Sequence, residues 1–321
     1  LTLLRSPGAS PSFADDLLQR VFDEIGEEAK GFGDLGAGFP LFLQASIPFS
    51  GGSDHYILAD PSVGIPCPMV NQWPDKFYHT SLDTPDKVDP KMLSRVGVAA
   101  ATYLYFLANA GEVETTWLGL EMVSRFKRRA ARVVQDGVTK VLTAARSDER
   151  SNILKQLLRV VGFQVEQEIG ALRSLKRLGR IELKGFEDEV RSFADKEIER
   201  ARAFLHRMVR VWEAKGKKLD RWEKRASELV PRRLFRGPLS LRPYILKLGD
   251  RDRERWHRVT KGKKELLFNL LPAAVYWSDG ERNLLDIADL LELEFDKREM
   301  ELLVSYFEIL AKLKLIELVL R

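Results

Sequence analysis

The sequence has little of what stabilises small secreted domains and nothing that a membrane requires. Cys67 is the one cysteine among 321 residues, so neither an intrachain disulfide nor a cysteine-based zinc site can form, and we expect a reducing, cytoplasmic compartment. No window approaches the ~18 uninterrupted apolar residues that a membrane-spanning helix needs, so we expect no membrane contact. Charged residues make up 31% of the chain and leave a net charge of +5, which disfavours a dedicated nucleic-acid binder.

The length and the opening residues indicate a multidomain protein. With 45% hydrophobic residues, the chain can bury a sizeable core, and its length suits two or three domains. It opens on Leu1-Thr-Leu-Leu4, an apolar, β-prone run with neither an initiator methionine nor a signal-peptide pattern. We therefore expect the chain to be the C-terminal fragment of a longer protein.

Residues 1–111 predict an alternation of strands, polar loops and helices. A helix is expected at about 13–28, because its apolar residues are spaced for one buried face. Short apolar runs at 39–47 and 68–72 predict strands, and a long helix is expected to begin near 88. This order is typical of a layered α/β domain whose functional site lies at strand ends.

Two loops of this segment concentrate polar residues. Ser50 to His55 and Tyr78 to Thr84 place two of the four histidines beside small and acidic residues. This pattern suits a metal site or an acid–base site. Taken alone, His79 is more typical of a hydrogen-bonding surface residue, and His55 could equally be a strand-end residue that fixes a turn.

The motifs of the two loops resemble a known family when they are taken in order. Ser53-Asp54-His55, then Gly64-Ile65-Pro66, then Tyr78-His79 with Asp83-Thr84 downstream, resemble the closing third of the M-twenty-eight metallopeptidases, the co-catalytic zinc aminopeptidases. The fuller run from Gln72 to Asp86 is similar to a bacterial aminopeptidase-like branch with extra C-terminal helical domains. The resemblance covers roughly the first 110 residues.

The resemblance implies a metal-binding hydrolase site. His79 would be the last zinc ligand, and Tyr78 would donate a hydrogen bond to the oxyanion. Ser53, Asp54 and His55 would line or support the substrate pocket, and Asp83 would brace the His79 loop. The family's other zinc ligands and its catalytic glutamate lie upstream of Leu1 in the pattern.

The expected function is that of a fragment. The parent protein would use two zinc ions to hydrolyse N-terminal peptide bonds of a peptide substrate, whereas this chain alone would bind zinc weakly at most and be inactive. Glutaminyl cyclases share the family's fold, so aminoacyl transfer without hydrolysis stays open. The alternative is a non-catalytic interaction or regulatory module.

Residues 112–229 are expected to form a helical hairpin or bundle. No proline occurs between 112 and 228, and apolar residues recur at helical spacing over 116–145, 147–178 and 186–224. The basic residues between Arg125 and Arg132 could contact an acidic partner, but a solvated helix face is the better interpretation, because acidic residues are plentiful along these helices.

Residues 230–321 are expected to form a small winged-helix-like domain. Val230 to Pro238 is interpreted as a linker or turn, followed by short helices and a terminal strand-like run. The helix at 296–308, which would read DNA in a winged helix, is acidic, so protein–protein contact is favoured over nucleic acid. The predicted fold class is thus α/β: a partial zinc-peptidase domain, a long-helix region and a winged-helix-like end.

Overall fold

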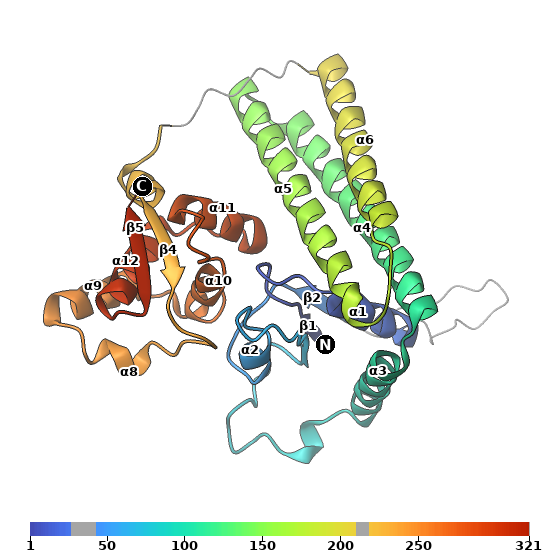
Figure 1. Ribbon diagram of the computed structural model, residues 1–321, viewed down its shortest axis with the longest axis horizontal. Helices are drawn as coiled ribbons and strands as arrows, with labels where there is room; N and C mark the ends of the chain where they lie inside the picture. Colours follow the sequence, from blue (N-terminus) through green and yellow to red (C-terminus); the bar gives the residue numbers. More distant parts are fainter. Residues whose placement is uncertain (27–42, 210–217, 321) are drawn as a thin grey trace.

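The chain is mostly helical. The computed structural model describes residues 1–26, 43–209 and 218–320, with 63% helix, 7% strand and two small sheets (Figure 1). The α/β class that the sequence predicts therefore holds only loosely, because the strands are three to five residues long and helices form most of the buried core. No helix in the described ranges is both long enough and apolar enough to cross a membrane.

A three-stranded sheet near the N-terminus carries the loops of interest. Its strands are β1 (Thr2–Leu4), β2 (Ala45–Ile47) and β3 (Met69–Asn71). β1 lies in the centre, parallel to β2 and antiparallel to β3. The predicted strands at 39–47 and 68–72 correspond to β2 and β3, and residues 39–42 fall outside the described part.

Two helices cover this sheet. α1 (Phe13–Gly26) turns its apolar face, which includes Phe22, towards β1. α3 (Pro90–Asn109) begins where the Asp89 carboxylate accepts hydrogen bonds from two backbone N–H groups of the first turn. Of α3, only Ala99 is fully buried. Between β2 and β3 lies one short helix, α2 (His55–Leu58).

Three long helices stand side by side next to the sheet, as Figure 1 shows. They are α4 (Glu112–Thr143), α5 (Ser147–Ser174) and α6 (Lys184–Met208). They share one apolar core, which also receives Leu17 of α1. The sequence predicted that the third helix would run to residue 224. Instead α6 ends at Met208 and a new helix starts after Asp220, whose carboxylate caps its first turn.

The remaining elements build a second apolar core at one side of the molecule (Figure 1). In chain order they are α7 (Arg221–Ser227), β4 (Leu229–Arg233), α8 (Arg242–Ile245), α9 (Asp250–Thr260), α10 (Leu270–Tyr276), α11 (Leu284–Phe295), α12 (Met300–Lys312) and β5 (Ile316–Leu320). Short 3-10 helices occur at Pro85–Lys87, Leu175–Arg177 and Lys264–Leu267. We call residues 221–320 the C-terminal unit.

The linker predicted from Val230 to Pro238 is partly wrong. Residues 229–233 form β4, which pairs antiparallel with β5 and bridges Asp279 through Arg232. The proline at 231 is tolerated because β4 belongs to a two-stranded ladder in which not every N–H needs a partner. Pairing with a strand more than eighty residues later stabilises this segment, and a local sequence pattern does not contain that information.

α12 is the central helix of the C-terminal unit. Nine of its thirteen residues are buried, including Ser305 and Phe307, and it packs against α7, α9, α11 and β5. A helix that reads DNA must expose one face to the major groove. α12 has no comparable free face, because most of its surface is covered by the elements around it.

Candidate functional site

His79 lies at the tip of an exposed turn between β3 and α3. Its backbone φ is 58°, in the left-handed region that residues other than glycine seldom adopt. Thr80 closes the turn, because both its N–H and its hydroxyl donate to the Phe77 carbonyl, at 3.0 and 2.7 Å. The Thr80 hydroxyl also accepts from the Leu82 N–H. The turn therefore fixes the backbone of His79 while its side chain stays exposed.

The imidazole of His79 stacks on a tyrosine. The ring centroids of Tyr78 and His79 are 3.7 Å apart and their planes differ by 20°. Trp73 packs edge-on against Tyr78 at 5.6 Å. Trp73 itself is exposed, so the three rings form a small aromatic group on the surface that holds the imidazole in one orientation.

His55 occupies a different environment. It is the first residue of α2 and is 5% exposed. Its Nε2 lies 2.7 Å from the Ser50 carbonyl oxygen, and its ring lies 5.7 Å from that of Phe49. Burial lowers the pKa of His55, although the Ser50 carbonyl and the Asp54 carboxylate oppose this effect. The neutral ring therefore donates from Nε2 to Ser50, and its buried Nδ1 has no hydrogen-bond partner.

The other predicted site residues are exposed. Ser53 and Asp54 precede α2, and their backbone carbonyls accept from the N–H groups of Tyr56 and Ile57. Asp83 touches the His79 turn through its backbone N–H, which donates to the Thr80 carbonyl at 3.3 Å. The turn is thus braced by Thr80 and by the backbone of Asp83. The pocket-lining roles of Ser53 and Asp54 stay predictions.

The described residues do not build a zinc centre by themselves. No group of three or more histidine, cysteine, aspartate or glutamate side chains in ranges 1–26, 43–209 and 218–320 is placed to hold a metal ion. A structural zinc needs four ligands and a catalytic one needs three. His79 supplies one exposed nitrogen donor.

Sequence reasoning missed an ion pair behind this region. The Asp60 side chain is completely buried, and both of its oxygens accept from the Arg233 guanidinium, at 3.0 and 2.8 Å. The sequence predicted Arg233 only as part of a linker or turn. The contact joins residues 173 positions apart, and no local signal marks it.

A second acidic residue, the half-buried Glu294, was also missed; its Oε2 atom is shielded from solvent. It belongs to α11 and accepts from the Gly8 N–H at 3.0 Å. Burial is the main cause that raises its pKa to about 7. Gly8 in turn accepts a hydrogen bond from Gln167 of α5 through its carbonyl. The N-terminal loop is therefore held between α5 and the C-terminal unit.

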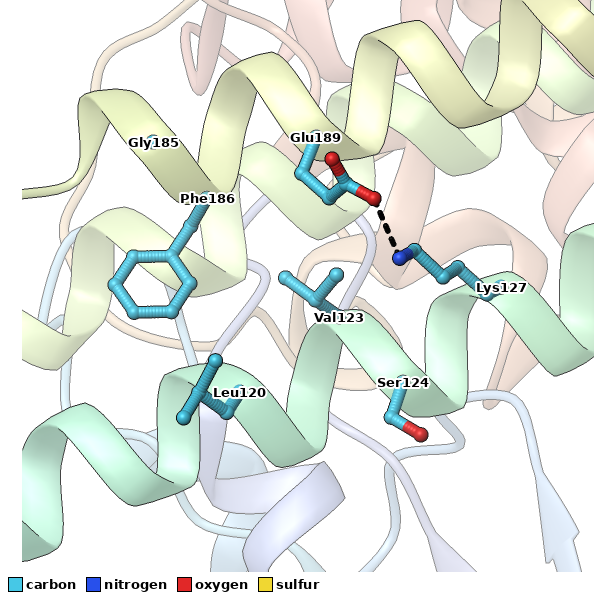
Figure 2. A pocket seen from close by; sticks show the side chains of 7 residues that line it. All are labelled: Leu120, Val123, Ser124, Lys127, Gly185, Phe186 and Glu189. Atoms are coloured by element: carbon cyan, nitrogen blue, oxygen red, sulfur yellow. Dashed lines mark hydrogen bonds and ion pairs between the residues drawn. The ribbon is translucent and has the colours of Figure 1, made fainter.

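Two cavities lie away from His79. The larger, of about 530 Å³, is open between α4 and α6 (Figure 2). Apolar side chains such as Val123 and Phe186 line it, and the ion pair between Lys127 and Glu189, at 2.5 Å, crosses one end. The second, of about 390 Å³, lies between α1, α3 and α4. Their lining includes neither Tyr78 nor His79.

Comparisons of the chain with models of protein families, with curated proteins and with solved structures found no match in any of the three.

Proposed function

We propose that this chain is the C-terminal part of a zinc aminopeptidase-like hydrolase and that His79 supplies one ligand of the metal site. The observation that carries the proposal is the geometry of His79. A residue other than glycine in the left-handed region costs ~1–2 kcal/mol, and strain of this kind gathers at functional sites. Here it presents an exposed imidazole that a neighbouring aromatic ring orients.

The site requires more than the described residues offer. A zinc pair, when bound, supplies Lewis-acid polarisation of the scissile carbonyl and a hydroxide nucleophile. The residues described here contribute the His79 imidazole, the phenol of Tyr78 as a donor to the developing oxyanion, and the wall from Ser53 to His55. The remaining zinc ligands would come from a part of the parent protein upstream of Leu1.

The experiment uses the product of the complete reading frame. Purified wild type, His79→Ala, Tyr78→Phe and the control His206→Ala, an exposed histidine of α6, are assayed for hydrolysis of aminoacyl p-nitroanilides. We expect His79→Ala to abolish hydrolysis, Tyr78→Phe to lower kcat ~10²-fold as loss of an oxyanion donor does, and His206→Ala to match wild type. Full activity of His79→Ala would contradict the proposal.

Two further observations separate the enzyme classes. Conversion of N-terminal glutaminyl peptides to a cyclised product, without hydrolysis of the anilides, would identify aminoacyl transfer instead. Absence of an in-frame series of histidine, aspartate, paired glutamates and a further acidic residue upstream of Leu1 would exclude the zinc hydrolase.

The second candidate, a non-catalytic module that contacts protein, is favoured by a specific observation. The C-terminal unit buries α12 and pairs Arg233 with Asp60 of the N-terminal segment. In this reading the unit binds its own chain in preference to nucleic acid. A mobility-shift assay on random duplex DNA at low and moderate salt would detect the nucleic-acid binding that we do not expect.

A further inference from the structure

The Asp60 carboxylate accepts four hydrogen bonds. Besides the two from Arg233, it accepts from the N–H and the hydroxyl of Ser62, at 2.9 and 2.6 Å. The Arg233 side chain is 10% exposed, and its guanidinium lies over the ring of Phe235, 4.4 Å from the ring centroid. A bidentate ion pair of this kind fixes the relative orientation of the two side chains as well as their distance, because two parallel N–H donors of the planar guanidinium match the two carboxylate oxygens.

The two partners differ in how their backbones are held. Arg233 belongs to β4 and pairs with Ile316 of β5, so its backbone is part of a ladder. Asp60 follows α2, five residues after His55, in a stretch without a strand partner. The Asp60 backbone is instead held in a local turn, where its carbonyl accepts from the N–H groups of Val63 and Gly64, both at 2.8 Å. The contact with Arg233 therefore joins this turn to the β4–β5 ladder.

The C-terminal unit makes further contacts with the same segment. The Gly51 N–H donates to the Phe268 carbonyl at 2.6 Å, and the Gly237 N–H donates to the Ser62 hydroxyl at 2.9 Å. A side chain at Gly51 would come within 3.1 Å of the Phe268 carbonyl oxygen, so the close approach of the two backbones suits glycine. The contacts thus reach both ends of the segment from 51 to 62.

Tyr276 of the C-terminal unit makes an apolar contact with this segment and with Phe49, which precedes it. Tyr276 of α10 packs against Phe49 at 5.7 Å and against Tyr56 at 6.2 Å, and Phe49 is in turn packed on His55. Phe49 and Tyr276 belong to one buried cluster with Ala59. Figure 1 shows α2 beside the small sheet, on the side of the C-terminal unit.

We propose that the C-terminal unit is a clamp for the segment from Gly51 to Ser62, and that Arg233, through Asp60, is a positioning residue for the Ser53–His55 wall of the candidate site. The clamp itself rests on contacts within this chain. Its role in shaping a substrate pocket rests on the proposed function.

Loss of the guanidinium leaves Asp60 buried without its counter-charge. Such a loss typically changes an equilibrium by ~100-fold or more, so the segment should open locally and admit water. Opening would solvate His55, whose pKa is lowered mainly by burial. The groups that face its ring are the Ser50 carbonyl, the Asp54 carboxylate and Phe49, and none of them is altered by a change at Arg233.

The test compares two neighbouring arginines in the full chain. Arg233→Met removes the clamp contact. Arg232→Met is the matched control, because Arg232 is the preceding residue of β4, is 59% exposed and pairs with the exposed Glu317. Two quantities are measured: the amide hydrogen-exchange rates of residues 51–62, and the pKa of His55 from its imidazole proton resonances, assigned with His55→Gln.

The clamp predicts a local response. In Arg233→Met the amides of 51–62 should exchange ~100-fold faster and the pKa of His55 should rise towards its ordinary value, while the amides of α5 exchange as in wild type. In Arg232→Met the exchange rates of residues 51–62 should stay within about threefold of wild type, and the pKa of His55 should stay within a few tenths of a pH unit of its wild-type value. Equal acceleration throughout the chain would indicate a merely structural role and overturn the proposal.

A milder variant keeps the test decisive if Arg233→Met does not fold. Arg233→Lys retains the charge but not the planar pair of donors, so the clamp predicts an exchange rate between those of wild type and Asp60→Asn. Wild-type exchange in Arg233→Lys together with Asp60→Asn would overturn it. Neither readout needs zinc or activity, so a failure here is distinct from a failure of the proposed hydrolase.

Discussion

Glu294 should make the chain less stable as the pH rises towards 7, which is the opposite of the usual effect of a carboxylate on stability. This half-buried residue of α11 faces the N-terminal loop, where its carboxylate accepts from the Gly8 N–H. Burial raises its pKa to about 7, against the hydrogen bond from the Gly8 N–H and the charge of Arg5, which lower it. The perturbation that isolates this effect is Glu294→Gln, which keeps the shape and removes the titration.

The magnitude follows from proton linkage. The pKa of Glu294 is about 7 in the folded chain against the ordinary 4.5, so between these values the folded state binds more protons than the unfolded state. The stabilisation is complete below pH 4.5 and is lost as the pH rises through 7. A difference of about 2.5 pH units corresponds to about 3 kcal/mol, of which about 2.5 kcal/mol falls between pH 5 and pH 8.

The assay is urea unfolding of both proteins from pH 5 to pH 8. Desolvation also raises the pKa values of two other carboxyl groups, to about 6 for the half-buried Asp15 and about 8 for the buried Glu168, and they act in the same direction in both proteins. The informative quantity is therefore the stability of Glu294→Gln minus that of wild type, which should become more favourable to the variant by about 2.5 kcal/mol over this range.

A control substitution at an exposed acid, Glu301→Gln, should leave the profile of the wild type unchanged, because the Glu301 side chain is 43% exposed. Parallel stability profiles for wild type and Glu294→Gln would refute the reasoning, since they would mean that Glu294 titrates alike in the folded and unfolded states.

Two further substitutions test the packing that supports the site. Arg129→Met should destabilise the chain by ~1–3 kcal/mol in chemical denaturation, because it leaves an oxygen of the buried Glu168 without the guanidinium donor that lies 2.5 Å away. Arg128→Met, at a side chain 65% exposed, should change stability by less than ~0.5 kcal/mol. Phe307→Ala should cost ~3–5 kcal/mol by thermal unfolding, because Phe307 is fully buried in α12, and a loss as small as that of exposed Leu320→Ala would contradict its place in the core.

The helices could be predicted from the sequence because their signals are local. Apolar residues at helical spacing indicated the three long helices, and the ends of α4 and α5 lie close to the predicted ones. β4 was missed because its proline and two arginines do not match the composition of a typical strand, and its stability comes from pairing with the distant β5. The strands of the first sheet are only three residues long, so the described part of the chain is mostly helical and fits the predicted α/β class only loosely.

For the candidate site, the position in the chain could be predicted from the sequence, but the conformation and the contacts could not. The motif placed His79 in a polar loop after a strand, and the structure has it there. Its positive φ and its stacking on Tyr78 are properties of the folded turn. The burial of His55 depends on Phe49 and on Tyr276, more than two hundred residues later, so its environment could not be predicted from its neighbours in sequence.

The zinc content of the complete protein tests the central claim most directly. The product of the complete reading frame is purified as wild type, as His79→Ala and as the control His206→Ala, and zinc per chain is measured by elemental analysis after dialysis. If His79 is a ligand of a zinc pair, wild type and His206→Ala should hold two zinc ions per chain and His79→Ala one at most. Two tightly held zinc ions in His79→Ala would contradict the account.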